Sequence, residues 1–284
     1  EQIIDFEGKL LPIADEFAGM PIEEARGKIV EKLDKKKLLV SVDENYVHRI
    51  AVSYRGKGKV EPQIKEQWFV DVNKPVIKWK NKNMSLKEVM QDVVRSGDIK
   101  IIPERFEKVY FHWIDNLRDW CVSRQIWWGH QFPAWTCDDC GELIVSNIDP
   151  EECTKCAGSK LVQETDVLDT WFSSALWPFS TLGWPDKTKE LSFFYPTSVL
   201  ITSFDILFFW VARMMMMGLH FMDDVPPFHT VYIHALVRDE HGAKMSKSKG
   251  NVVDPLDLID TYGADALRFF LSASAAQGRD VRLS

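Results

Sequence analysis

The sequence predicts an α/β fold, and the clearest pattern lies after residue 166. Two short apolar runs, Ser198–Thr202 and Thr230–Val237, have the length and composition of buried strands. Between them, the mostly apolar segment Asp205–Phe221 is long enough to form a buried helix that packs against the sheet. A strand, a buried helix and a second strand in this order are typical of layered α/β domains.

The N-terminal part of the chain, up to about residue 45, predicts a small α+β piece. Pro21 stands where a first helical turn would begin, and apolar residues follow at helical spacing as far as Leu33. Lysines from Lys35 onward suit the C-terminal end of that helix. Leu38–Val42 then predicts a strand, and Gln67–Val72 predicts another.

Further helices are predicted on both sides of the α/β part. Ser85 and Glu88 have the spacing of a capping box, which predicts a helix directly after them. Ile99–Ile102 is expected to be extended, and residues 104–121 are expected to be helical and rich in aromatic side chains. Near the C-terminus, Asp254 precedes a proline at a predicted helix start, and a second helix follows.

The composition excludes some classes of function. The 284 residues are 45% hydrophobic and 27% charged, as in an ordinary folded soluble protein. The net charge is −7, so any contact with RNA has to come from local basic patches. The most apolar stretch, Ile206–Phe221, is predicted to be too short to span a bilayer. The first residues contain neither an initiator methionine nor a signal peptide, which predicts a piece of a longer chain.

Four of the five cysteines form two Cys-x-x-Cys pairs, which are Cys137 with Cys140 and Cys153 with Cys156. Four thiolates at this spacing are typical of a closed, tetrahedral structural zinc site, and glycines follow both pairs as tight knuckles require. The alternatives are reduced pairs without metal, or a disulfide. Without a secretion signal, this cysteine usage indicates a reducing compartment and therefore a cytoplasmic protein. Cys121 lies outside the pairs and is predicted to be a buried small hydrophobe.

A short loop after the second predicted strand carries three lysines in an acidic chain: Lys244, Lys247 and Lys249. Gly242 and Gly250 flank this lysine loop and allow it to move. Ligands of α/β sheets bind at the carboxyl ends of the strands. Mobile ammonium groups suit a triphosphate, because they can follow the negative charge that builds up during attack at the α-phosphorus. A solvated basic turn is the alternative for a loop of this composition.

The string Lys-Met-Ser-Lys-Ser at 244–248, after a strand and before a helix, resembles the signature loop of class I aminoacyl-tRNA synthetases. The run Asp119–His130 resembles the segment that follows the editing insertion in the valine, isoleucine and leucine members. The runs Asp166–Pro178 and Asp205–Met214 resemble the valine-specific members. The isoleucine members are expected to have a polar Asp-Gln sequence at the start of the latter run.

The resemblance implies a fold, a reaction and partners. The fold would be the second half of a Rossmann-like class I synthetase catalytic domain, with a zinc-knuckle insertion and the α+β tail of the editing insertion. The carboxylate of valine would attack the α-phosphorus of ATP, which is bound with Mg²⁺, and the 3′-terminal ribose of tRNA(Val) would then take the valyl group. The implied partners are valine, ATP and tRNA(Val), with no membrane, and the implied state is a monomer.

The resemblance also implies the residues of the ATP site. Lys247 would contact the phosphates most directly and Lys244 would assist, so both are the implied catalytic residues. Ser246 belongs to the same loop, and His234 would lie beside the ribose or the adenine at the end of its strand. Without the resemblance, His234 is interpreted as a hydrogen-bonded structural residue.

The implied amino-acid site has one charged and three apolar residues. Asp205 is expected to face the ammonium group of the amino acid. Ile206, Trp210 and Trp171 are expected to wall its small branched side chain. Without the resemblance, the two tryptophans are core residues and Asp205 is a helix cap. Ser203 stands where the family normally has glycine, and its side chain is expected to obstruct the approach of ATP to the backbone.

The resemblance divides the chain into five parts. Residues 1–60 would be the C-terminal tail of the editing insertion, 61–134 the connection back into the catalytic domain, 135–165 the zinc-binding insertion, 166–240 the second half of the nucleotide-binding fold, and 241–284 the lysine loop with the start of the helical stem-contact region. The catalytic segment for editing would lie before Glu1, so editing is expected to be absent.

The family's other ATP motif, a His-x-Gly-His pair, does not occur in the sequence. We therefore predict that this chain alone neither activates valine nor charges tRNA. Two alternative functions are an isoleucine-type ligase and a non-catalytic, zinc-stabilised RNA-binding paralogue. Asp205-Ile206 argues against the first, and the retained lysines argue against the second.

Overall fold

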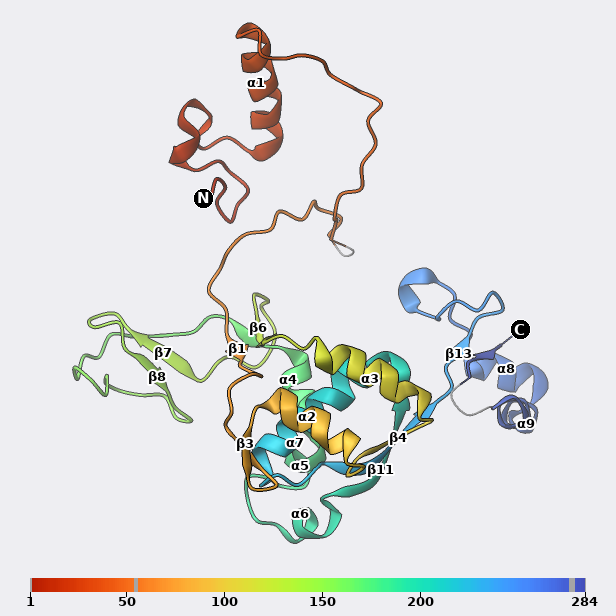
Figure 1. Ribbon diagram of the computed structural model, residues 1–284. Helices are drawn as coiled ribbons and strands as arrows, with labels where there is room; N and C mark the ends of the chain where they lie inside the picture. Colours follow the sequence, from red (N-terminus) through yellow and green to blue (C-terminus); the bar gives the residue numbers. More distant parts are fainter. Residues whose placement is uncertain (1, 54–55, 276–278, 284) are drawn as a thin grey trace. The chain divides into compact units, whose positions relative to one another are not determined.

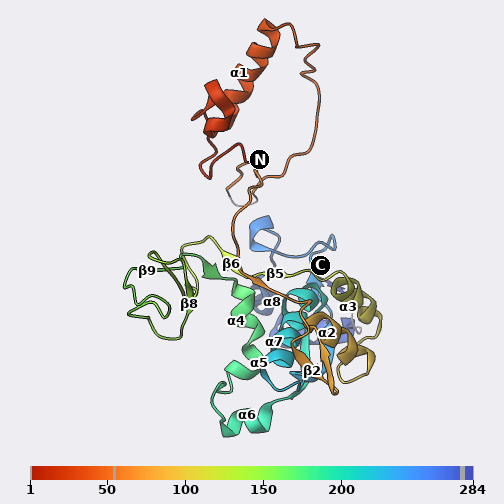
Figure 2. The ribbon, with the colours of Figure 1, turned by 60° about the vertical axis from the view of Figure 1, so that its left-hand side comes forward.

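The computed structural model describes residues 2–53, 56–275 and 279–283, without the side chain of Ser248. It divides into two compact units, Glu1–Glu66 and Gln67–Ser284, which are described separately (Figures 1 and 2). The domain boundary predicted near residue 60 falls inside the first unit.

The first unit contains one long helix and little core. Its helices are the 3₁₀ helix η1 (Pro12–Phe17) and α1 (Ile22–Lys35), and Pro21 directly precedes α1 as predicted. The predicted strand Leu38–Val42 is wrong, because this segment has no strand partner among the described residues and Val40 is 97% exposed. A strand is stable only where a neighbour takes its backbone hydrogen bonds, and alternation of side chains cannot supply that neighbour.

A parallel sheet forms the centre of the second unit. Its strand order is β11–β12–β4, with β11 at Thr197–Ser203, β12 at Phe228–His234 and β4 at Lys100–Ile102. The three predicted strands of this part are confirmed, but the last one ends at His234 rather than at Val237. Val237 belongs to the separate strand β13 (Val237–Arg238), which pairs with β14 (Val281–Arg282).

The two faces of the sheet differ in exposure. Leu200, Val231 and Ile101 lie side by side in register on one face, and all three are buried. Val199 and Ile201 of β11 point the other way, because side chains alternate along a strand, and they are 48% and 63% exposed. In the described part of the chain, β11 pairs only with β12. Helices therefore cover one face of the sheet, while the opposite face of β11 is open.

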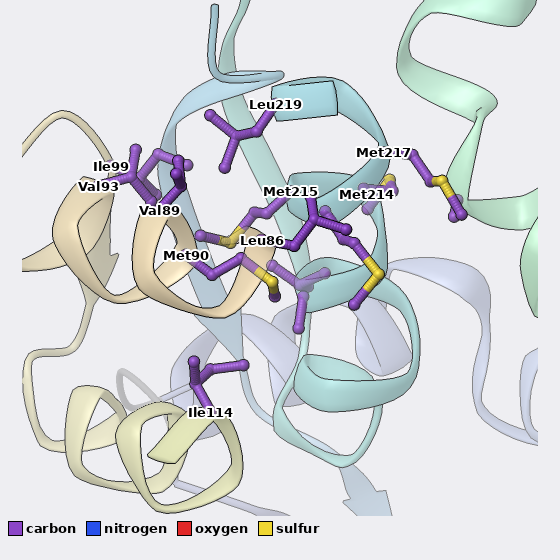
Figure 3. Close-up of a cluster of buried hydrophobic side chains, with 14 of the residues drawn as sticks. Leu86, Val89, Met90, Val93, Ile99, Ile114, Met214, Met215, Met217 and Leu219 are labelled. Carbon is purple, nitrogen blue, oxygen red and sulfur yellow. The ribbon is translucent and has the colours of Figure 1, made fainter. Parts of the chain in front are cut away.

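Three helices supply the core of the covered face: α2 (Leu86–Arg95), α3 (Arg105–Asp115) and α7 (Arg213–Phe221). Figure 3 shows the α2 side chains Leu86, Val89 and Met90 facing methionines of α7, with Ile114 of α3 below them. Each fully buried side chain of this size contributes about 1.5–3 kcal/mol of hydrophobic free energy. This packing fixes α7 against the sheet.

The predicted helix Asp205–Phe221 is helical throughout but not uniform. It begins as the 3₁₀ turn η2 (Phe204–Ile206), continues as the π-helix η3 (Leu207–Ala212) and becomes regular only in α7. The run Phe204–Phe221 is long and apolar enough to cross a membrane by length and composition, so the prediction that this stretch is too short is wrong. Met214–Met217 are all buried inside the unit, as in the core helix of a globular domain.

Two local predictions have different outcomes. The capping box is confirmed, since the Ser85 hydroxyl accepts a hydrogen bond from the Glu88 N–H and the Glu88 carboxylate accepts one from the Ser85 N–H. The helix predicted over 104–121 ends at Asp115. Trp120–Cys121 instead forms the strand β5, which pairs with β1 (Phe69–Val70). Backbone pairing with a distant strand overrides the aromatic helical pattern here.

The remaining elements complete the second unit. They are the strands β2 (Ile77–Trp79), β3 (Lys82–Met84), β6 (Ser123–Arg124), β7 (Ala134–Cys137), β8 (Leu143–Val145), β9 (Leu161–Gln163) and β10 (Val167–Leu168), the helices α4 (Thr170–Ala175), α5 (Trp177–Ser180), α6 (Lys189–Phe194), α8 (Pro255–Tyr262) and α9 (Ala264–Ser274), and the 3₁₀ turn η4 (Lys247–Lys249). The two predicted C-terminal helices are confirmed, and the Asp254 side chain caps α8.

Candidate active site and metal centre

Part of the predicted site lies at the carboxyl ends of β11 and β12. Ser203 is the last residue of β11 and lies opposite His234, the last residue of β12. Asp205 follows directly in η2. Ligands of parallel α/β sheets bind at this end of the strands, so the topology puts these side chains where a substrate is expected.

Asp205 is the charged residue at this end of the sheet, and both of its carboxylate oxygens are occupied. Oδ1 accepts a hydrogen bond from the Ser203 hydroxyl, and Oδ2 pairs with the Nζ of Lys244. Partial burial raises the pKa of Asp205, but the hydrogen bonds from Lys244 and Ser203 outweigh this effect and hold the pKa below its usual value. Asp205 is therefore an ionised carboxylate with an ammonium group already bound to it.

Ile206 and Trp210 follow Asp205 in η2 and η3, and Trp171 lies on α4, which packs against η3. Ile206, Trp210 and Trp171 are all half-buried, so the interpretation of the tryptophans as simple core residues is incomplete. The Trp210 Nε1 donates to the Ser174 carbonyl oxygen at 3.1 Å, and the Trp171 ring lies 5.7 Å from the ring of Phe209. The indole of Trp210 is thus satisfied by α4, and each ring keeps part of its surface exposed.

Arg213 is a buried residue that the sequence analysis did not single out. Its guanidinium lies 4.2 Å from the ring centroid of Trp120, 5.1 Å from that of Phe209 and 5.9 Å from that of Trp171. Burial lowers the pKa of Arg213 to about 10, so it stays charged at neutral pH. Its cation–π contacts link Trp171 of α4 and Phe209 of η3 to the start of α7. An arginine within an apolar helical pattern was the available signal.

The lysine loop is held by Asn251, which sequence reasoning also missed. The side-chain amide of Asn251 accepts from the Ser246 N–H at 2.9 Å and donates to the Asp239 carboxylate at 2.8 Å. The Lys244 backbone forms an antiparallel bridge with Arg238, so the first part of the loop folds back on β13. Gly250 has φ +69°, a left-handed conformation that suits glycine and ends η4.

The structure brings only part of the predicted ATP site together. Lys244 reaches Asp205, whereas Lys247 is exposed in η4 and has no ion pair with another predicted site residue in the described part of the chain. The Ser246 backbone is bound to Asn251. The His234 Nδ1 lies 2.7 Å from the Ala235 carbonyl oxygen, at the strand end where it was predicted. The loop lysine predicted to assist with phosphates therefore contacts the residue predicted to bind the amino acid.

The four paired cysteines converge beside a small antiparallel sheet of order β8–β7–β9. Figure 2 shows the ribbon of this sheet. The four Sγ atoms lie within 4.8 Å of one another, and the Cys137–Cys156 and Cys140–Cys153 sulfurs are each 3.6 Å apart. Four thiolates at about 2.3 Å from a tetrahedral zinc ion lie roughly 3.8 Å apart. The sulfurs are too distant for disulfides, so the donor set fits a zinc ion.

The two knuckles use different means to turn tightly. In the first, Gly141 has φ +71°. In the second, Ala157 has the positive φ, while a Cβ on Gly158 would lie 2.3 Å from the Asp139 carboxylate. Backbone N–H groups of Lys155 and Cys156 lower the pKa of the Cys153 thiol to about 7, whereas hydrogen bonds with the other cysteines raise the pKa of the Cys156 thiol. Cys121, which was predicted to be buried, is half-buried and lies outside this cluster.

Comparison with known proteins extends the likeness from motifs to nearly the whole chain. A family model described as tRNA synthetases class I (I, L, M and V) matches residues 28–284. The chain belongs to this family. It is 58% identical over 282 residues to the valine–tRNA ligase of Desulfotalea psychrophila and 51% identical over 282 residues to that of Thermotoga maritima, covering 99% of this chain in both cases.

The chain matches only part of the length of these relatives. The chain spans 30% of the length of the Desulfotalea psychrophila relative and 31% of the Thermotoga maritima one. Among solved structures, methionyl-tRNA synthetase of Mycobacterium tuberculosis bound by methionyl-adenylate matches with a TM-score of 0.51 and 19% identity, covering 83% of this chain and 38% of that chain. This likeness supports the class I synthetase fold.

Proposed function

We propose that this chain forms the second half of the activation site of a valine–tRNA ligase. The observation that carries the proposal is the ionised Asp205 at the end of β11, with Ile206 and Trp210 in the helical run that follows it, in a chain 50–58% identical to valine–tRNA ligases. An ionised carboxylate suits an α-ammonium group, and half-buried indole rings suit a small apolar side chain. Ile206 directly follows Asp205 and supplies a branched wall for that side chain.

In this proposal the carboxylate of valine attacks the α-phosphorus of ATP, which enters as its magnesium complex. The bond to pyrophosphate breaks, valyl-adenylate forms, and a hydroxyl of the 3′-terminal ribose of tRNA(Val) then takes the valyl group and releases AMP. Lys247 and Lys244 neutralise the charge on the leaving pyrophosphate as flexible point charges. Ser246 and His234 complete the ATP site.

The other parts of the chain have supporting roles in the proposal. Cys137, Cys140, Cys153 and Cys156 hold a structural zinc ion that braces residues 135–165, and residues 1–60 are the tail of the editing insertion. The fit of the sulfur distances to a tetrahedral site supports the first assignment. The enzyme acts as a cytoplasmic monomer, without a membrane.

A chimera tests the proposal most directly. This chain replaces the matching part of the Desulfotalea psychrophila valine–tRNA ligase, and ATP–pyrophosphate exchange is measured with valine and with isoleucine. We expect valine-dependent exchange by the chimera and none by the 284-residue chain alone. Faster exchange with isoleucine would contradict the valine assignment. Exchange by the isolated chain at the rate of an intact synthetase would contradict the assignment of half a site.

A further inference from the structure

Ser203 is a polar residue at the end of β11 that the proposed reaction leaves without a role. Its side chain is almost buried, and its hydroxyl donates a hydrogen bond to Oδ1 of Asp205. The other oxygen of that carboxylate is paired with Lys244. The two oxygens of Asp205 therefore have different partners. Ser203 belongs to a strand, and Lys244 belongs to the lysine loop.

This difference decides which oxygen a ligand can reach. The Ser203 backbone is part of the parallel ladder with β12 and its side chain is buried, so it has far less freedom to move away than a loop residue. Lys244 lies in the loop between Gly242 and Gly250, which both have positive φ, and its side chain is 59% exposed. A ligand can therefore displace Lys244 from Oδ2, whereas Ser203 stays on Oδ1. The Lys244 side chain ends in the group that an amino acid carries on its α-carbon, an ammonium with three donors.

We propose that Ser203 is a positioning residue that holds the Asp205 carboxylate for the α-ammonium group of the amino acid, and that Lys244 fills the ammonium position until the amino acid arrives. The inference rests on the proposed function, because it takes Asp205 as the ammonium ligand. Arrival of the amino acid releases Lys244 towards the triphosphate. Binding of the amino acid and availability of a catalytic lysine are then coupled through one carboxylate.

The surroundings of Asp205 make this contact measurable. Lys244 is the charged group that faces it from the loop, and on β12 the His234 Nδ1 is turned to the Ala235 carbonyl. Partial burial raises the pKa of Asp205, while the bonds from Lys244 and Ser203 lower it. Loss of the Ser203 hydroxyl must therefore raise the pKa of Asp205, and the carboxylate must lose its charge at a higher pH.

The first measurement is a ¹³C-carboxyl NMR titration of the 284-residue chain and its Ser203→Ala variant. The matched control is Ser96→Ala, because the Ser96 hydroxyl donates to the Asp98 carboxylate at 2.6 Å with the same two-residue spacing. We expect Ser203→Ala to raise the pKa of Asp205 and not that of Asp98, and Ser96→Ala to do the opposite. An unchanged pKa of Asp205 in Ser203→Ala overturns the positioning role.

The second measurement adds valine, or 3-methylbutanoate, which is valine without the ammonium group. Of these two compounds, we expect only valine to shift the NMR signals of the Lys244 ε-methylene group. We expect Ser203→Ala to weaken valine binding about five- to tenfold, the typical effect of one lost hydrogen bond, and to move the acid limit of binding to higher pH. A shift of Lys244 by both compounds alike would overturn the displacement.

The outcomes separate this proposal from the function on which it rests. Normal valine binding with an unchanged pKa of Asp205 in Ser203→Ala overturns the role of Ser203 and leaves the proposed function standing. If valine changes no signal of Asp205, Ile206 or Trp210, while Ser203→Ala still raises the pKa of Asp205, the amino-acid assignment of the site is wrong, and this proposal fails with it.

Discussion

The cysteine cluster and the strand-end site are assembled in opposite ways. The four cysteines lie within residues 137–156, on two knuckles of one small sheet, and their sulfurs converge through local turns. The partners of Asp205 come from β11 and from the lysine loop, which are far apart in the sequence. A local motif thus needs only its own turns, whereas the distributed site needs the whole sheet.

The two regions also differ in the hydrophobic core that stabilises them. Among the described residues, the hydrophobic core of the cluster consists of Cys137, Ile144 and Cys153, so two of its members are themselves proposed metal ligands. The strand-end site stands on the large core that α2, α3 and α7 build against the sheet. We therefore expect loss of metal to unfold the first region without disturbing the second.

The largest effect is expected from removing one thiolate. Cys137→Ser should abolish stoichiometric zinc, because metal binding in such sites is worth on the order of 10 kcal/mol and is coupled to folding. Element analysis together with amide exchange over β7–β9 checks this, and protection of α2 and α7 should remain. Cys121→Ser is the matched control and should keep its zinc. Zinc retained in Cys137→Ser would contradict the assignment of Cys137 as a metal ligand, and with it the expected difference between the two regions.

A smaller effect, confined to the strand-end site, is expected from substitutions in the lysine loop. In the chimera, Lys247→Ala should slow valine-dependent pyrophosphate exchange about 10²–10³-fold, the usual cost of losing one charge-stabilising donor in a transition state. Lys249→Ala, two residues away in η4, should change the rate little. Equal losses in both variants would indicate that the loop acts through its total charge rather than through one lysine.

The smallest effect is expected where sequence alone predicted the structure. Ser85→Ala should lower the free energy of unfolding of the second unit by about 1 kcal/mol through loss of the cap. Denaturant unfolding checks this, with the exposed Ser192→Ala on α6 as the control and zinc content unchanged. The Ser85 N–H and hydroxyl hold the pKa of Glu88 below its usual value. The contribution of the capping box to the free energy of unfolding should therefore persist at neutral pH and fade as pH falls through the acid range. A change near zero in the free energy of unfolding would mean that the packing of α2, and not its cap, determines where the helix begins.

The sequence by itself determined the features that depend on neighbours in the chain. The capping box, the helix start at Asp254, the cysteine spacing and the strand–helix–strand order are all present as predicted. These features follow from turns, caps and side-chain periods that involve only a few consecutive residues. The family motif also located the strand ends at which Asp205 and His234 lie.

Only the tertiary structure decided which distant groups meet. The false strand at Leu38–Val42, the end of α3 at Asp115 and the break after His234 all depend on whether a pairing partner is present, which no local pattern records. The contacts of Asp205 with Ser203 and Lys244 are of the same kind. The Ser203 hydroxyl donates a hydrogen bond to a carboxylate, because hydrogen bonds are set by the geometry of the folded strand ends and not by the order of residues.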